Sequence, residues 1–197
     1  MKRFLLIFFL TFSFEILVKA DDIRDFEIEG LSLGDSALEI QNKDAIEEQK
    51  KLPDAFYPKS KRFFTVSFGK SKLNLETYEA LQLELKSNDS KYIIYSIMGK
   101  IYFPNNIEGC YKKQNDIAKD LAKLFKNVQI DHKGISNHGW DKSGKSTRKR
   151  IIFWFDGTED YVKLVCNDWS DELNQRDNLG VTINSGEFAN FLRNEAY

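Results

Sequence analysis

The sequence predicts an α+β fold of two layers, in which an antiparallel sheet is covered by one long helix plus shorter helices. Three observations lead to this prediction. Residues 105–128 have the period of a single amphipathic helix. Short β-branched and aromatic runs, separated by turn residues, come before and after that helix. Consecutive strands of this kind pair as antiparallel neighbours, and with helices on one face they make a two-layer sandwich. The two cysteines fall in the helix and in a late strand.

The long helix is predicted from the spacing of its apolar residues. Asn105 and Glu108 resemble a capping box at its start, and Pro104 ends the strand before it. The residues between the apolar positions are mostly Lys, Asp and Gln, which form a solvated face. The apolar positions follow the steps of one face of a helix with 3.6 residues per turn: Cys110, Ile117, Ala118, Leu121, Leu124, Phe125 and Val128.

A meander of strands is predicted before the long helix. Residues 77–86 are ambiguous, because the leucines at 81–85 alternate as in a strand whereas the sequence Glu-Ala-Leu-Gln-Leu-Glu has helical propensity. We expect a strand, since residues 88–90 suit a hairpin turn into the next run. A second turn is expected at 98–100. The predicted strands are 63–68, 77–86, 92–97 and 101–103.

After the long helix, a brief strand is expected at 128–130 and a polar loop at 131–147. Two strong strands joined at Asp156-Gly157 follow, then a last strand, and Ser185 caps a final helix. Two short helices are expected before the first strand. These elements are strands 148–155, 160–166 and 179–183, and helices 37–40, 44–51 and 187–194.

The first twenty residues resemble a cleavable signal peptide. Met1-Lys2-Arg3 is basic, residues 4–14 are apolar, and Val18-Lys19-Ala20 supplies the small residues that signal peptidase requires. The apolar stretch is short for a transmembrane span, although an uncleaved anchor is the alternative. We therefore expect residues 1–20 to be a signal peptide, residues 21–197 to be a single α+β domain, and the mature protein to be periplasmic or secreted, without a stable membrane span.

The charge balance argues against a nucleic-acid binder. Residues 1–20 hold three basic side chains and one acidic, so the rest of the chain carries 26 basic and 29 acidic side chains, a net charge of −3. Domains that bind nucleic acids normally carry a basic excess. Residues 21–197 are enough for one domain with a sizeable core.

The two cysteines are expected to form a disulfide, because an exported chain matures in an oxidising compartment. The alternative is two small buried thiols. A Cys110–Cys166 bond closes a loop for which the chain-entropy model gives a stabilisation of at most roughly 4 kcal/mol.

A basic segment offers the candidate binding residues. Residues 131–150 hold six Lys or Arg against two Asp, together with both histidines, in a chain that is otherwise acidic. Such a segment binds anionic partners such as lipid head groups, cell-wall phosphates or an acidic protein face; the alternative is a solvated hairpin loop. The candidate contacts are Lys133, His138, Trp140, Lys142, Lys145 and Arg148. His132 and His138 lack a clear third ligand, so no metal is expected.

Motifs of catalysis or cofactor binding are sparse. Residues 139–146 match the letters G-x-x-x-x-G-K-[ST] of a phosphate-binding loop, but a basic strand is expected after them where that motif needs a helix. The acidic residues at 167–172 lack the pattern of a calcium loop, and a short helical turn is expected there. Trp169 either packs near the disulfide or is an exposed contact. A disulfide removes the thiolate that a Cys–His pair requires. No cofactor is expected.

Several segments resemble a family of exported proteins from small-genome marine bacteria: DFEIEGLSLGDSAL, DSKYIIYSIMGKIYF, NNIEGCYKKQNDIAKDLAKLF, DKSGKST and LVCNDWSDEL. The resemblance covers most of residues 21–197. It implies secretion and a single fold, and because no activity is assigned to the family, it implies no functional residue.

The sequence therefore favours an exported, non-catalytic binding or envelope-associated module with one disulfide, whose partner is an anionic envelope component or an envelope protein. Two alternatives stay open. One is a periplasmic hydrolase or lyase of unrecognised type, and the other is a docking subunit or chaperone of an envelope assembly.

Overall fold

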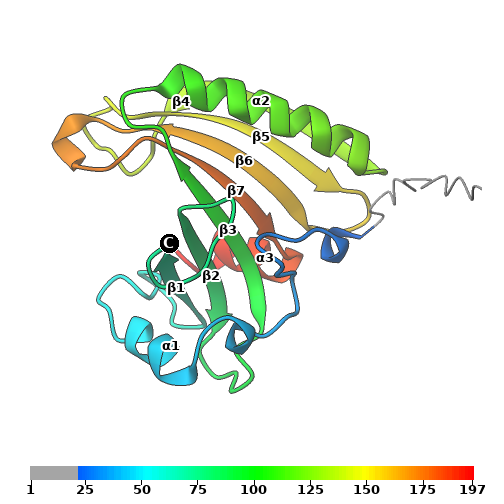
Figure 1. Ribbon diagram of the computed structural model, residues 1–197, viewed down its shortest axis with the longest axis vertical. Coiled ribbons are helices and arrows are strands. Elements are labelled where there is room, and N and C mark those ends of the chain that lie inside the picture. Colours follow the sequence, from blue (N-terminus) through cyan, green and yellow to red (C-terminus); the bar gives the residue numbers. More distant parts are fainter. Residues whose placement is uncertain (1–21) are drawn as a thin grey trace, which may run out of the picture.

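The computed structural model describes residues 22–197, so the expected signal peptide, residues 1–20, lies outside the described residues. The chain forms seven strands, three α-helices and three short 3-10 helices within that range. In order (Figure 1), they are η1 (Ile23–Asp25), η2 (Ala37–Glu39), α1 (Lys43–Lys50), β1 (Phe63–Gly69), β2 (Ala80–Lys86), β3 (Ile94–Tyr102), α2 (Ile107–Leu124), β4 (Val128–Asn137), β5 (Thr147–Phe155), β6 (Tyr161–Asp168), η3 (Asp171–Leu173), β7 (Asn178–Asn184) and α3 (Gly186–Asn194).

The seven strands form one antiparallel sheet with the order β1-β2-β3-β7-β6-β5-β4. β7 comes last in the sequence but pairs with β3 on one side and with β6 on the other. It therefore joins the strands that precede α2 to the strands that follow it (Figure 1). A single antiparallel sheet with helices packed against it confirms the predicted α+β fold.

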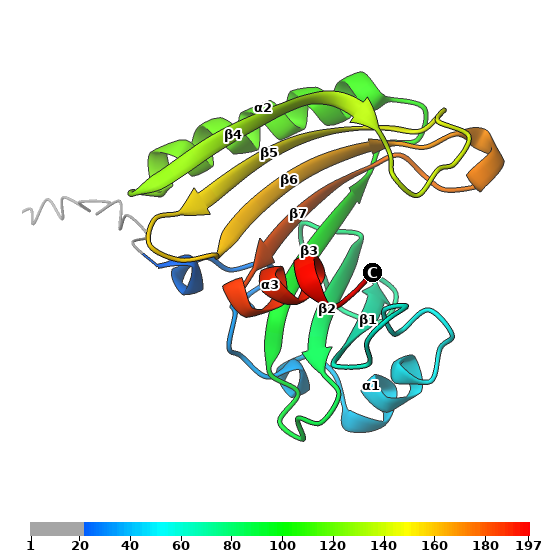
Figure 2. The ribbon, with the colours of Figure 1, turned by 180° about the vertical axis from the view of Figure 1, so that it is seen from behind.

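The two faces of the sheet are covered differently. α1 and α2 pack on one face, which we call the helix face, and the main hydrophobic core lies beneath them. α3 packs on the opposite face, which we call the open face, and covers only part of it (Figures 1 and 2). Phe188 and Phe191 hold α3 there, with ring centroids 5.2 and 4.8 Å from that of Phe63. The sequence suggested that the helices share one face of the sheet, but they lie on both faces.

α2 is shorter than residues 105–128. Its N-cap is Asn106, whose side chain accepts a hydrogen bond of 3.0 Å from the Gly109 N–H. Asn105 has a φ of 54° and precedes the helix, and the residue three after the Asn106 cap is Gly109, so the predicted capping box of Asn105 and Glu108 is wrong. At the other end, Phe125 is extended and buried, and Val128 already belongs to β4.

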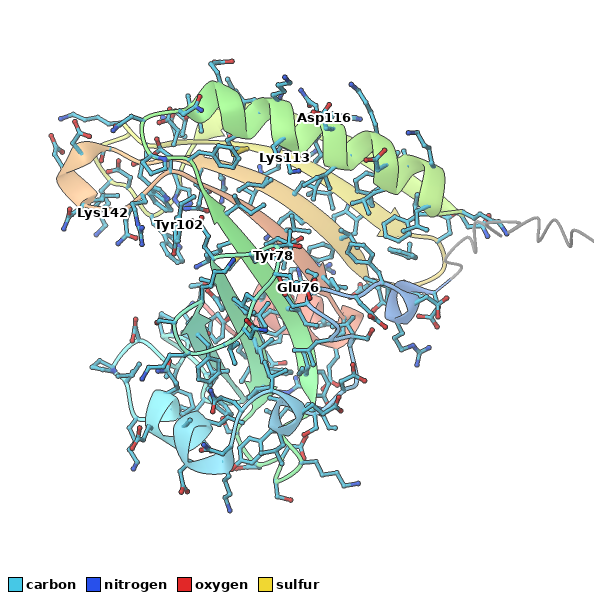
Figure 3. The ribbon with its side chains drawn as sticks, in the orientation of Figure 1. Glu76, Tyr78, Tyr102, Lys113, Asp116 and Lys142 are labelled. Atoms are coloured by element: carbon cyan, nitrogen blue, oxygen red, sulfur yellow. A yellow bond between two sulfur atoms is a disulfide. The ribbon has the colours of Figure 1, made fainter. Side chains whose placement is uncertain are left out.

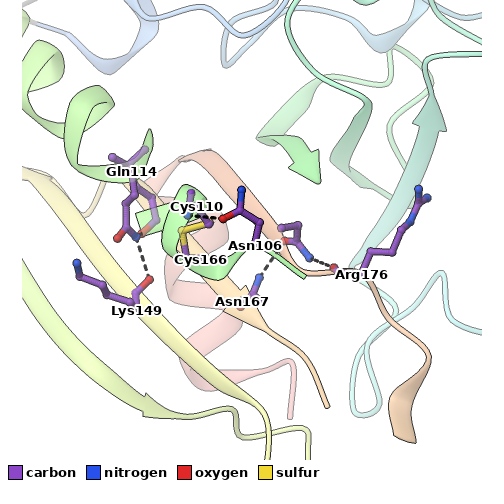
Figure 4. The surroundings of a disulfide bond; sticks show 10 residues. Asn106, Cys110, Gln114, Lys149, Cys166, Asn167 and Arg176 are labelled. Atoms are coloured by element: carbon purple, nitrogen blue, oxygen red, sulfur yellow. Dashed lines mark hydrogen bonds between the residues drawn. A yellow bond between two sulfur atoms is a disulfide. The ribbon is translucent and has the colours of Figure 1, made fainter. Parts of the chain in front are cut away.

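The Cys110–Cys166 disulfide is confirmed (Figure 4). The two Cα atoms are 6.0 Å apart, and both residues are fully buried. One turn further along α2, the buried Gln114 donates hydrogen bonds from Nε2 to the carbonyl oxygens of Lys149 and Leu164, at 2.9 and 3.1 Å. The disulfide and this amide together fix α2 against β5 and β6.

The turn expected at residues 98–100 is absent, because β3 runs without interruption from Ile94 to Tyr102. Gly99 has a different role. A Cβ atom at this position would lie 2.5 Å from the ring of Tyr78, so glycine lets that ring pack directly against the strand (Figure 3).

The polar loop expected at 131–147 is wrong over residues 131–137, because β4 extends to Asn137 and pairs with β5. β4 is an edge strand and most of its side chains are exposed. Its sequence therefore lacks the apolar alternation that marks a half-buried strand.

Within residues 22–197, no helix has the length and apolar character needed to cross a membrane.

Candidate functional site

A cluster of cations lies on the open face of β5 and β6. Successive side chains of a strand point to opposite faces. Ile151 and Leu164 belong to the core beneath α2, so Arg150 and Lys163 point to the other side. Arg148 precedes Arg150 by two residues and shares its side, and the β5–β6 register makes Arg150 and Lys163 diagonal neighbours. We call Arg148, Arg150 and Lys163 the cation triad.

The cation triad has no acidic partner. Among residues 22–197, no carboxylate forms an ion pair with any of its members. The Nε atoms of Arg148 and Arg150 are buried without a hydrogen bond. Burial, and then the charges of Arg150 and Arg148, lowers the pKa of Lys163 to about 8. Burial and Arg150 likewise lower the pKa of Arg148. Three like charges therefore share one partly dehydrated surface.

The surface around the triad is closely packed and mostly apolar. Ile152 and Val165 are buried on the same face, and Thr182 is 5% exposed with no hydrogen-bond partner for its Oγ1. Next to Val165 lies Gly180, where a Cβ atom would be 3.2 Å from the Sδ of Met98. These neighbours bring no negative charge, and their low polarity strengthens the attraction between the triad and an anion. On β4, Asp131 lies on the same face opposite Ile152, where it forms an ion pair with Lys133.

A second charged cluster on the open face is internally satisfied. Glu84 is 4% exposed and accepts hydrogen bonds from Thr65 Oγ1 at 2.9 Å and from Gln82 Nε2 at 3.0 Å. Lys100 donates from Nζ to Gln82 Oε1 at 3.2 Å. Burial raises the pKa of Glu84 to about 7, and burial lowers the pKa of Lys100 while the Glu84 charge raises it. Since each group has a partner, this cluster is structural.

An open groove of about 650 Å³ lies beside the N-terminus of α3, and its charges are also paired. Arg62 forms ion pairs with Glu187 and with Glu195. Asp160 accepts a hydrogen bond from the Gly186 N–H at 2.5 Å. The groove therefore offers a ligand little charge that is not already neutralised.

Residues 138–146 form the loop between β4 and β5, beside Arg148. His138 is buried and lies with its ring centroid 4.2 Å from that of Trp169. Burial, and next the charge of Arg148, lowers the pKa of His138. Trp169 is therefore half-buried and packs against the loop through the His138 ring.

The six candidate contacts differ in exposure and in charge pairing. Arg148 belongs to the cation triad, and Lys133 is the β4 residue paired in register with Arg150, where it also forms a 2.8 Å ion pair with Asp131. The other four lie in the loop: His138 is buried, Trp140 and Lys142 are exposed, and Lys145 pairs with Glu172 (Figure 3 labels Lys142).

Sequence reasoning missed two members of the triad, Arg150 and Lys163. A signal for the first was present, because Arg148 and Arg150 alternate within a run that is otherwise typical of a strand. Lys163 stands alone between Val162 and Leu164, and only the strand register places it beside the arginines.

Other chemistries find little support in the described part of the chain. Residues 139–146 are followed by β5, so the phosphate-loop pattern lacks its helix. Residues 22–197 contain no group of three His, Cys, Asp or Glu that could hold a metal ion. Both cysteines are in the disulfide, and neither is available as a nucleophile.

Comparison of the chain with protein-family models, with curated proteins and with solved structures gave no match.

Proposed function

We propose that this protein is an exported binding protein whose open face holds an anionic group of an envelope component. The cation triad is the observation that carries the proposal. Two guanidinium groups and an ammonium group lie on adjacent strands, and within residues 22–197 none of them forms an ion pair with a carboxylate. A phosphate or carboxylate group would supply the missing charge, and arginine is well suited to bind either.

The energetic cost of the triad supports a role in binding. Burying a charge without a partner destabilises a fold, and apolar side chains of similar size are usually at least as stabilising. The lowered pKa values of Lys163 and Arg148 reflect that cost. Residues that reduce stability in this way are characteristic of sites built for a ligand.

Calorimetric titration with inorganic pyrophosphate and citrate tests the proposal. The variant Arg148→Gln/Arg150→Gln/Lys163→Gln should lose at least about tenfold in affinity, since one charge-assisted hydrogen bond contributes roughly 1.5–3 kcal/mol. The matched control changes Lys112, Lys113 and Lys119 to Gln; these lysines are exposed on α2, so the variant loses the same charge elsewhere (Figure 3 labels Lys113).

Equal losses in the two variants would mean that the anions respond only to net charge, and the proposal would be wrong. Circular dichroism and urea unfolding of both variants establish that the affinities are compared between folded proteins. We also expect the affinity of the unmodified protein for these anions to fall strongly with salt concentration, because simple anions compete for the same cations.

A further inference from the structure

The end of the β4–β5 hairpin holds its largest apolar side chains out in water. Trp140 is 74% exposed and Ile135 is 62% exposed, and these are the two most exposed large hydrophobic residues within residues 22–197. They lie five residues apart, at the same end of the edge strand. We call residues 133–146 the hairpin tip. Two such side chains in one small region indicate a contact surface.

The hairpin tip is internally fixed. Asp141 is 8% exposed and accepts hydrogen bonds from the N–H groups of Ser143 and Ser146 at 2.8 and 2.9 Å, and from the hydroxyls of Ser146 and Ser170 at 2.6 and 3.2 Å. Hydrogen bonds from Ser143, and next those from Ser146, hold the pKa of Asp141 far below the usual range. A loop with this many internal bonds presents Trp140 in a preorganised position, which reduces the entropy lost on binding.

The charge beside these apolar residues is positive. Lys142 is exposed and forms no ion pair within residues 22–197, and Arg148 of the triad follows the loop directly. Lys133 lies at the start of the tip and shares its charge with Asp131. Lys145 forms an ion pair with Glu172, so within residues 22–197 Lys142 is the lysine of the tip that is free to contact an anion. An exposed Trp and Ile beside such a lysine suit the interface of an anionic bilayer, where Trp lies at the head groups and Lys contacts the phosphates.

We propose that the hairpin tip docks on an anionic lipid surface, with Trp140 and Ile135 inserted at the boundary between head groups and acyl chains. Ile135 favours a bilayer over a glycan or a nucleotide, because an aliphatic side chain has no polar group to recognise those ligands but gains free energy on leaving water. The two inserting side chains are not part of the anion site proposed above, which lies on the open face of β5 and β6 and has only Arg148 in common with the surroundings of the tip.

Sedimentation with vesicles of phosphatidylglycerol and phosphatidylcholine tests this inference, with pure phosphatidylcholine as the uncharged reference. The variant Trp140→Ala/Ile135→Ser should bind the anionic vesicles at least about tenfold more weakly than the unmodified protein. The control variant Leu52→Ser/Leu38→Ser removes two other exposed apolar side chains, 46% and 43% exposed, and should bind normally.

Three outcomes would overturn the inference. The first is that the unmodified protein does not bind the anionic vesicles, and the second is that the tip variant and the control variant bind them equally well. The third is that the tip variant loses binding to pyrophosphate as well as binding to vesicles. The last result would make Trp140 and Ile135 part of the anion site. Conversely, the triad variant Arg148→Gln/Arg150→Gln/Lys163→Gln should lose pyrophosphate binding. Its Trp140 should still insert into the vesicles, which is measured as quenching of Trp fluorescence by brominated acyl chains. The two proposals therefore fail separately.

Discussion

Replacing Lys163 with methionine is expected to stabilise the protein and to weaken anion binding at the same time. The pKa of the ammonium group falls from 10.5 to about 8 in the fold. One pKa unit corresponds to about 1.4 kcal/mol, so at pH 7 the buried charge costs on the order of 2–3 kcal/mol after allowance for its partial exposure. Methionine keeps the apolar stem and removes the charge.

The pH dependence follows from the direction of this shift. Because the unfolded chain binds the proton more tightly, the penalty is fully present below pH 8 and disappears as the pH rises from 8 to 10.5. The gain in the free energy of unfolding, measured with urea, should therefore be largest at pH 7 and smaller at pH 10. Lys113→Met on the exposed side of α2 should change stability by no more than about 0.5 kcal/mol. If Lys163→Met were destabilising at pH 7, the buried charge of Lys163 would not reduce the stability of the fold, and the prediction would be wrong.

Three further predictions concern the scaffold that positions the open face. The stability advantage of Glu84→Gln over the unmodified protein, measured by urea unfolding, should grow by about 3 kcal/mol as the pH rises from 4.5 to 8. The reason is that the pKa of Glu84 is about 7 in the fold and near 4.5 in the unfolded chain, so ionising the folded carboxyl costs free energy. A stability difference independent of pH would contradict this prediction. Replacing Cys110 and Cys166 with alanine should lower the free energy of unfolding by about 2–4 kcal/mol, and a change below about 1 kcal/mol would show that the hydrogen bonds of α2 suffice. Gly99→Ala should lower the free energy of unfolding by about 1–3 kcal/mol, and with it the melting temperature, since the new methyl group displaces the ring of Tyr78. An unchanged melting temperature would mean that the ring moves freely.

The elements that sequence reasoning predicted well are those that place a regularly spaced set of apolar side chains in the main core. α2, β1, β5, β6 and β7 show the apolar period of a helix or a strand, because each packs against the core on one side. The disulfide was predicted from the expected export of the chain and from the number of cysteines. α3 was also predicted, including its Ser185 cap, which accepts a hydrogen bond from the Phe188 N–H.

The errors have physical causes of their own. β4 is an edge strand with both faces largely in water, so its sequence has no apolar alternation. Gly99 resembled a turn residue, but the close approach of Tyr78 explains it. The cation triad depends on the register between β5 and β6, and no local pattern around Lys163 specifies that register. The candidate site was thus predicted in part, through Arg148.

The most direct test of the central claim is the nuclear magnetic resonance spectrum of the arginine Nε–H groups during titration with pyrophosphate. Arg148 and Arg150 have buried Nε atoms without partners, so their Nε–H signals should shift and sharpen as the anion binds. Arg62 already forms ion pairs with Glu187 and Glu195, so its signal should stay in place. Saturable shifts at Arg148 and Arg150 alone are the predicted result. Shifts spread equally over all arginines, or absent from these two, would contradict an anion site on the open face.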